Sequence, residues 1–338
     1  MLPIRYVYGQ VSEKFLQTVQ RHSLSSALEY VKASDYLKQT RRNERILVSG
    51  TIDEIKAILQ HAIAHGNEVA IIPEPTQTAL QSAFGLSKHL EENVQTAMTQ
   101  EAQSMDILYA NDALVLYNAL IGDAPPLNYH VSRYHRTTFK ERVQSLYQAY
   151  LKVKQLQHTR LTFQTAKGQM IETVATGVVV LEYDNKTCAA KLVQDSVGIN
   201  DSKLDALIIS PKSTVEYLQL MSKAIFNRTH PSTLPNAIGH IQTQHLTIES
   251  KLTLPLLIDG KVLGSTPVTF RIQPQALTMV LPEKFWNKVP EKLSDKETIK
   301  TDKLPHSHEK MNYLQKKLPL FTHAGEKEYK TLFSTLRD

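Results

Sequence analysis

The stretch from Leu257 to Pro282, LIDGKVLGSTPVTFRIQPQALTMVLP, decides the fold class of the C-terminal half of the chain. Turn residues separate its apolar and β-branched runs, which predicts strands over Pro255–Ile258, Val268–Ile272 and Ala276–Leu281. Asp259-Gly260-Lys261, between the first two strands, is typical of a hairpin turn that begins at Asp259. The stretch therefore indicates a β-rich unit.

Further strands precede this stretch. We predict them over Arg160–Thr165, Glu172–Tyr183, Leu204–Ile209, Ile238–Gln242 and Leu246–Leu252. Ala166-Lys167-Gly168-Gln169 joins the first two as a hairpin turn. We expect a helix among these strands, over Thr214–Phe226, and an amphipathic helix before them, over Phe139–Val153. Many strands with few helices predict a β-sandwich-like domain, to which we assign residues 125–282.

The N-terminal third has a different pattern, in which strands and helices alternate. We predict strands over Ile4–Tyr8, Arg45–Gly50 and Glu68–Ile72, and helices over Ser12–His22, Thr78–Phe84 and Leu90–Gln103. Thr51-Ile52-Asp53-Glu54 has the capping-box spacing, in which Thr51 caps the next helix and Glu54 reaches back to its amide. Such alternation is typical of a parallel sheet covered on both faces. We therefore assign residues 1–124 to an α/β domain of the nucleotide-binding type.

The composition changes after residue 282. Residues 283–309 are rich in Lys, Glu, Asp and Thr, which predicts a polar, solvated linker. Residues 310–338 regain apolar side chains. We expect this last segment to dock, either on this chain or on a partner protein.

The overall composition is that of an ordinary globular protein, with 41% hydrophobic and 21% charged residues among 338. The formal net charge of +6 is mild for this length, so it does not by itself imply nucleic acid. It suits weak attraction to phosphorylated ligands or to an anionic membrane face. Cys188 is the only cysteine and the N-terminus lacks the apolar core of a signal peptide. Both features predict a cytoplasmic protein, with a peripheral position at the inner membrane face as an open alternative.

The C-terminal strands resemble the last strands of the diacylglycerol kinase catalytic-domain family, which includes bacterial lipid kinases and sphingosine kinases. The shared features are Asp259-Gly260, Thr266-Pro267, Pro274-Gln275-Ala276-Leu277 and Val280-Leu281-Pro282. Earlier segments are similar too, at Ser49 to Glu54, Pro73 to Leu86 and Asn200 to Asp205. The resemblance implies a two-domain, NAD kinase-like fold, with an active site between an α/β nucleotide domain and a β-sandwich lipid domain. It also implies a parent reaction, in which the γ-phosphate of ATP is transferred to a lipid hydroxyl with Mg²⁺.

Three departures fall where the resemblance places the machinery of phosphoryl transfer. Ser49 stands at the position of the catalytic aspartate, and Lys261 at the position of an acting glutamate, which reverses the charge. Pro75 replaces a glycine in the second phosphate loop and has no amide to donate. Phosphoryl transfer needs an amide-lined cradle, a metal and a positioned carboxylate. The departures therefore predict that standard ATP binding is lost.

The resemblance nevertheless assigns ligand positions. The positions of the degenerate nucleotide loops are Gly50, Thr51, Pro75, Thr76 and Thr78. Asp201 and Asp205 are candidate metal ligands, although turn chemistry explains them more simply. The candidates for an anion or lipid-headgroup site are Arg133, His135, Arg136 and Lys261, although a solvated basic face explains the first three better.

Three functional hypotheses follow. The first is a catalytically degenerate lipid kinase-like protein, or pseudokinase, that binds a lipid or anion or regulates a partner, with no cofactor assigned. The second is an active lipid kinase with an atypical phosphate cradle, which would use ATP and Mg²⁺. The third is an interaction protein that docks through residues 310–338.

Overall fold

The protein is described from a computed structural model of the chain. The structure describes residues 2–22, 28–122, 157–182, 200–211, 213, 216, 237–286, 297–301 and 304. The helix predicted over Phe139–Val153 and the 310–338 segment lie outside the described residues, as does all of the Thr214–Phe226 prediction except residue 216.

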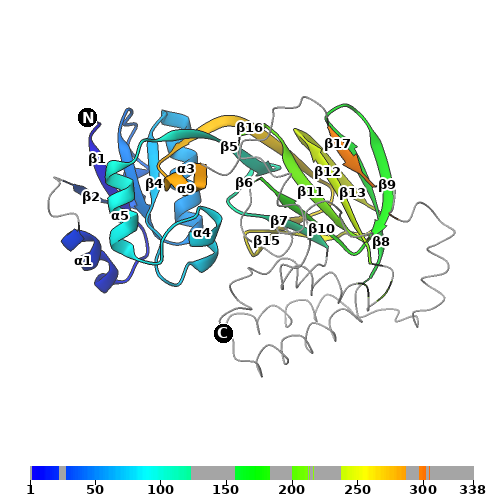
Figure 1. The fold of residues 1–338 in the computed structure, drawn as a ribbon, viewed down its shortest axis with the longest axis horizontal. Coiled ribbons are helices and arrows are strands. Elements are labelled where there is room, and N and C mark those ends of the chain that lie inside the picture. The colour runs from blue at the N-terminus through cyan, green and yellow to red at the C-terminus, as the bar shows by residue number, and fades with distance from the viewer. Residues whose placement is uncertain are drawn as a thin grey trace, which may run out of the picture.

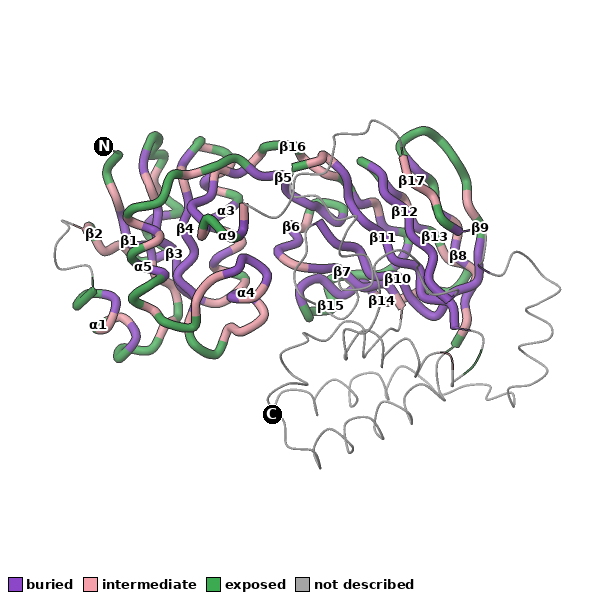
Figure 2. Tube along the Cα trace, in the orientation of Figure 1, coloured by how far each residue is buried: buried purple, intermediate pink, exposed green. Residues whose placement is uncertain are grey.

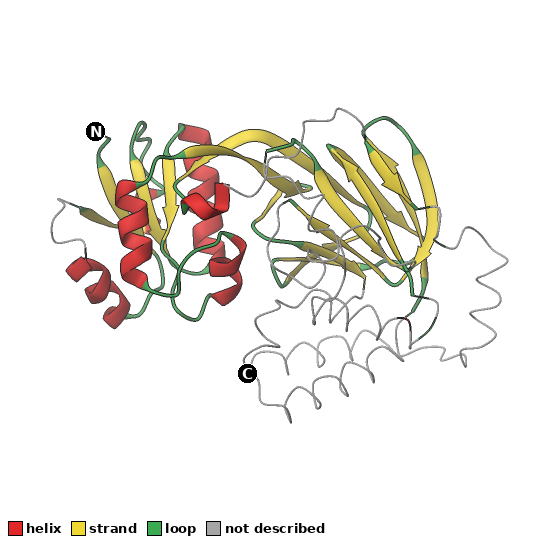
Figure 3. Ribbon diagram, in the orientation of Figure 1, coloured by secondary structure: helices red, strands yellow, loops and turns green. Residues whose placement is uncertain are grey.

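The N-terminal part is an α/β unit, as predicted. Its parallel strands are β1 (Ile4–Tyr8), β2 (Glu29–Lys32), β3 (Arg45–Ser49) and β4 (Glu68–Ile71), in the order β2-β1-β3-β4. Its helices are α1 (Glu13–His22), α2 (Ala33–Tyr36), α3 (Ile52–His65), α4 (Thr78–Ala83) and α5 (Leu90–Thr99) (Figure 3). Alternate residues of β3 enter two different cores: Val48 packs with α3 and α4, and Leu47 with α1 and α5. Helices therefore cover both faces of the sheet.

Helix α3 begins and ends where local chemistry predicts. Thr51 and Glu54 form the expected capping box, and Gly66 ends the helix with a φ of 68°. That left-handed conformation suits glycine because a side chain there would be strained. The capping box fixes the position of the α3 N-terminus, which contributes to the site described below.

Two strands connect the halves of the molecule, β5 (Gln103–Ala110) and β16 (Val268–Met279) (Figure 1). One end of β16 pairs with β4 and the other with β13 (His245–Ser250). The two strands predicted over Val268–Ile272 and Ala276–Leu281 are therefore one strand. Its pairing with β5 shifts register between Gln273 and Leu277, which is the break that the sequence suggested.

The C-terminal part is the predicted β-sandwich. The first sheet continues from β16 into β13, β8 (Thr159–Thr165) and β9 (Met170–Ala175), and β5 also pairs with β6 (Ala113–Val115). The second sheet, in the order β15-β14-β7-β10-β11-β12-β17, comprises β7 (Ala119–Gly122), β10 (Gly177–Leu181), β11 (Leu204–Ile209), β12 (Ile238–Thr243), β14 (Pro255–Ile258), β15 (Lys261–Ser265) and β17 (Thr298–Lys300). Apolar residues of both sheets share one core.

Three details differ from the sequence prediction. The strand predicted over Glu172–Tyr183 is two strands, because the chain leaves the first sheet after β9 and enters the second as β10. Strand β7 lies before residue 124 but belongs to the second sheet. Conversely, α9 (Glu283–Trp286), which follows β16, places Phe285 in the core of the α/β unit. Sheet membership therefore crosses the expected division at residues 124 and 282.

Candidate functional site

The candidate site lies at the carboxyl ends of β1, β3 and β4, where parallel α/β sheets bind their ligands. Three loops meet there, formed by residues 9–12, 50–51 and 72–77. The second and third contain the positions that the resemblance assigned to nucleotide loops. The hydrogen bonds of each loop show which backbone donors face the site.

The carboxylate of Glu54 occupies the first part of this region. It accepts hydrogen bonds from the Gln10 amide (2.9 Å), the Thr51 amide (2.8 Å) and the Thr51 hydroxyl (2.9 Å). Gly9 and Gly50 make room for it, since a Cβ on either would lie within 2.7 Å of a Glu54 oxygen. The amides of the first two loops therefore bind an anion that belongs to the chain itself.

A second carboxylate, Glu74, lies in the Pro73–Thr78 loop. Its Oε1 accepts a hydrogen bond from the Ser12 amide, 3.1 Å away, at the start of α1. The Gln77 side chain donates to the Gly50 carbonyl (2.7 Å) and accepts from the Glu74 amide (3.0 Å). Pro75, beside it, has no amide. The loop is thus held by side-chain contacts where a phosphate loop would present free amides.

Thr76 and Thr78 contribute to the backbone of the same turn. The Thr78 amide donates to the Thr76 carbonyl, 2.9 Å away, immediately before α4. The structure therefore brings all five predicted nucleotide-loop residues, Gly50, Thr51, Pro75, Thr76 and Thr78, to one end of the sheet.

Ser49 is fully buried at the end of β3. Its Oγ accepts a hydrogen bond from the Tyr6 hydroxyl (2.8 Å) and donates one to the Ile72 carbonyl (2.6 Å). These bonds join the end of β3 to β1 and to the residue that follows β4. In this arrangement the Ser49 hydroxyl makes structural hydrogen bonds between strands.

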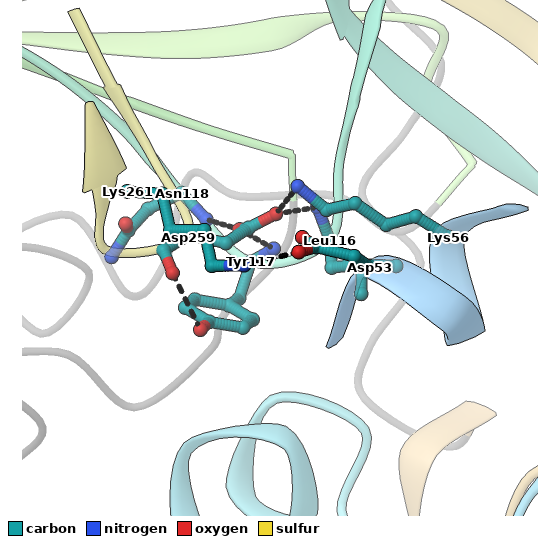
Figure 4. Close-up of polar contacts among 7 residues, drawn as sticks. All are labelled: Asp53, Lys56, Leu116, Tyr117, Asn118, Asp259 and Lys261. Atoms are coloured by element: carbon teal, nitrogen blue, oxygen red, sulfur yellow. Dashed lines mark hydrogen bonds and ion pairs between the residues drawn. The ribbon is translucent and has the colours of Figure 1, made fainter. Parts of the chain in front are cut away.

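The β14–β15 hairpin brings the second domain to the N-terminus of α3 (Figure 4). Asp259 has the predicted turn conformation, with a φ of 51°, followed by Gly260 at 85°. Its carboxylate is buried and accepts hydrogen bonds from three consecutive amides, those of Leu116, Tyr117 and Asn118, at 2.9 to 3.2 Å. It also forms an ion pair with Lys56 of α3, at 2.6 Å. Asp259 is therefore more than a turn residue, because it joins the hairpin, the segment before β7 and α3.

Lys261 lies in the same hairpin and forms an ion pair with Asp53 of α3 (Figure 4). Both side chains are more than half exposed. Two ion pairs thus join the first turns of α3 to the hairpin, Lys56 with Asp259 and Asp53 with Lys261. A lysine replaces a carboxylate at the one position where the resemblance expects a glutamate to act.

The predicted metal ligands Asp201 and Asp205 lie elsewhere, at the start of β11. Asp201 accepts a hydrogen bond from the Lys203 amide (3.0 Å), the expected turn chemistry, and another from Gln242 (3.2 Å). Asp205 contacts the His240 ring at 2.5 Å. In the described part of the chain, no group of three or more His, Cys, Asp or Glu side chains is arranged to hold a metal ion.

A buried acidic cluster surrounds these two aspartates and was not predicted. Glu182 is buried, and neither of its carboxylate oxygens has a hydrogen-bond donor among the described residues. Burial raises its pKa well above the usual range, and so do the charges of Asp106, Asp201 and Asp205. Burial, followed by the charge of Asp205, raises the pKa of Asp201 to about 6. Both carboxyls therefore hold their protons to a higher pH than exposed carboxyls do.

The other predictions concern residues beyond this region. Arg133, His135 and Arg136 lie outside the described residues. Sequence reasoning missed Lys56, Glu74 and Gln77, for which no local pattern gives a signal. Glu54 was found as a helix cap, but its contact with Gln10 depends on the fold. In the described part of the chain, no helix is long and apolar enough to cross a membrane.

Comparison with known proteins shows which proteins this chain is similar to. The profile of the YegS C-terminal NAD kinase beta sandwich-like domain matches residues 127–281. "Probable lipid kinase YegS-like" of Shewanella frigidimarina is 21% identical to this chain, in a match that covers 69% of this chain and 74% of the relative. An uncharacterised protein of Synechocystis is 20% identical, and the chain covers 54% of its length.

A solved structure shares the fold. The crystal structure of a diacylglycerol kinase from Bacillus anthracis superposes with a TM-score of 0.61 at 17% identity, covering 83% of this chain and 97% of that one. The match extends over both domains, including the α/β unit that the domain profile leaves out. The chain is similar to the diacylglycerol kinase and YegS-like lipid kinases, and it has their two-domain fold.

Proposed function

We propose that this protein is a catalytically degenerate member of its family, which binds a lipid or a lipid phosphate without transferring a phosphoryl group. One observation carries the proposal: the carboxylates of Asp53, Glu54, Glu74 and Asp259, at the site and the domain junction, are each held by donors of the chain itself. A carboxylate held in this way is a poor general base and a poor metal ligand, because it must break existing contacts before it can accept a proton or bind a metal ion.

The charges at the loops that follow β1, β3 and β4 support the same proposal. Glu54 matches the glutamate of the family pattern and Pro75 departs from that pattern, which leaves the position of Glu74 open. Glu74 places a second negative charge beside the first and occupies the Ser12 amide. A nucleotide phosphate would meet repulsion and fewer donors there. The lipid ligand is proposed from the family, whose named relatives are lipid kinases.

Native mass spectrometry of the purified protein, with and without Mg·ATP, tests both parts. We expect a lipid-sized adduct that survives gentle desolvation, and no adduct of the mass of ATP. Thermal unfolding in the same buffers should give equal Tm values with and without Mg·ATP. Mg·ATP binding together with phosphorylation of an extracted lipid would replace this proposal with an active kinase. If no lipid is found and residues 310–338 retain a partner protein, the interaction hypothesis stands instead.

A further inference from the structure

Three strongly exposed apolar side chains lie along the β14–β15 edge of the second sheet. Leu252 (56% exposed) precedes β14, and Val262 (55%) and Leu263 (52%) lie in β15. All five residues of β15 are exposed, and the strand forms the end of its sheet (Figure 2). Several exposed apolar side chains along one edge mark an interaction surface more strongly than single scattered ones do.

Hydrogen bonds hold the loop of Leu252 against this edge. Pro255 pairs with Ser265, and the Leu254 amide donates to the Thr266 hydroxyl at 3.1 Å. Thr266 in turn donates to the Leu252 carbonyl. The apolar side chains are therefore presented by a fixed hairpin.

The form of the edge argues against pairing with another strand. The register shifts between Leu256 and Leu257, so that Leu263 has no partner in β14. A bulge of this kind interrupts the regular row of backbone groups that strand addition requires. The edge therefore presents exposed apolar side chains, and the partner that fits it binds these side chains without adding a β-strand to the sheet.

Lysines flank the apolar side chains on both segments. Lys251 precedes Leu252 and has no ion-pair partner among the described residues, and Lys261, which also contacts Asp53, precedes Val262. Apolar side chains beside a lysine fit an anionic bilayer, where the apolar side chains enter the headgroup region and the Lys251 ammonium group meets lipid phosphates. The net charge of +6 adds a weak attraction in the same direction.

We propose that this apolar edge, formed by Lys251, Leu252, Lys261, Val262 and Leu263, docks on the surface of an anionic lipid bilayer. The inference rests on the proposed lipid ligand and adds the route by which it arrives. The same hairpin carries Asp259, which contacts Lys56 at the domain junction. Docking through β15 therefore brings the junction against the bilayer.

Co-sedimentation with vesicles tests the docking surface. The full chain is mixed with phosphatidylcholine vesicles that contain or lack phosphatidylglycerol, and the bound fraction is measured. The double variant Leu252→Ser/Leu263→Ser should bind the anionic vesicles about tenfold more weakly or worse, because two leucine side chains no longer enter the bilayer. Met170→Ser is the matched control, since Met170 is 69% exposed but lies in the other sheet. It should bind as the wild type does.

Each contrary result has a separate meaning. Equal binding by the double variant, or no binding of wild type to anionic vesicles, overturns the docking surface. Light scattering after gel filtration identifies a second copy as the occupant if the wild type is a dimer and the double variant a monomer, which also overturns it. The native mass spectra remain independent: a lipid adduct without vesicle binding refutes only the docking surface. Vesicle binding without any adduct refutes only the bound lipid.

Discussion

The Nζ atom of Lys56 lies 2.6 Å from a carboxylate oxygen of Asp259, although 203 residues separate them in the chain. Lys56 is on α3 of the α/β unit and Asp259 is in the β14–β15 turn of the sandwich. The Asp259 side chain is 1% exposed and that of Lys56 is 13% exposed. This contact therefore links the two domains at the place where the family's active site is expected.

Replacing Lys56 by methionine should destabilise the protein strongly. The variant leaves the buried Asp259 carboxylate without its cation, which costs about 2–4 kcal/mol. Lys261→Met removes the other ion pair of the junction, whose side chains are more than half exposed, and should cost less than about 1 kcal/mol. Urea denaturation measures both free energies of unfolding. If the two variants lose equal free energy of unfolding, burial does not decide the strength of these ion pairs.

Placing the family's aspartate at position 49 should destabilise the protein. Ser49→Asp places a carboxylate at a fully buried position whose neighbours are the Tyr6 hydroxyl and the Ile72 carbonyl. We expect a loss of about 3 kcal/mol or more, because the charge gains one donor and faces one acceptor. Ser49→Ala, the control, should lose about 1–3 kcal/mol. Unchanged stability of the aspartate variant would mean that this position is open to solvent or to a cation.

Removing Glu74 should uncover an anion site. Glu74→Ala frees the Ser12 amide at the start of α1 and removes one negative charge. Sulfate at several times its dissociation constant should then stabilise the variant by about 1 kcal/mol, while the wild type shows no such gain. Glu101→Ala, an exposed control with the same charge change, should behave like the wild type. Tm values over a sulfate titration, at constant ionic strength, provide the measurement.

The buried acids predict a stability that falls as the pH rises. The folded-state pKa values of Glu182 and Asp201 are raised, that of Asp201 to about 6, so the folded protein holds these protons more tightly than the unfolded chain does. Their contribution is complete below the unfolded pKa values of about 4 and is lost as the pH rises through the folded ones.

Glu182→Gln tests this linkage, since it keeps the shape and removes the charge. The variant should be more stable than the wild type at pH 8, and the difference should shrink toward pH 5. Glu249→Gln, on the exposed part of β13, should leave the pH profile unchanged. Parallel unfolding profiles of wild type and Glu182→Gln between pH 5 and 8 would rule out a role for this carboxyl.

Local features of the fold could be predicted wherever a few neighbouring residues decide them. The capping box at Thr51 and Glu54 and the hairpin at Ala166–Gln169 depend on side-chain spacing and turn chemistry, and both are confirmed. Strand β15 was missed, because an exposed edge strand lacks the apolar alternation of a half-buried one. The break at residue 176, between β9 and β10, was missed because both strands are apolar and consecutive.

The sequence by itself determined the two-domain architecture and the resemblance to the lipid kinases, because both depend on periodicity, turns and motifs that can be read in the order of the residues. It also placed Ser49, Pro75 and Lys261 at the positions where the chemistry departs. Only the tertiary structure decided which groups come into contact at the candidate site and the domain junction. The Glu74 carboxylate accepts from the Ser12 amide, Asp53 pairs with Lys261, and Lys56 pairs with Asp259. Hydrogen bonds and ion pairs need contact within a few ångströms, and contact between residues far apart in the chain arises only when the strands and helices have packed.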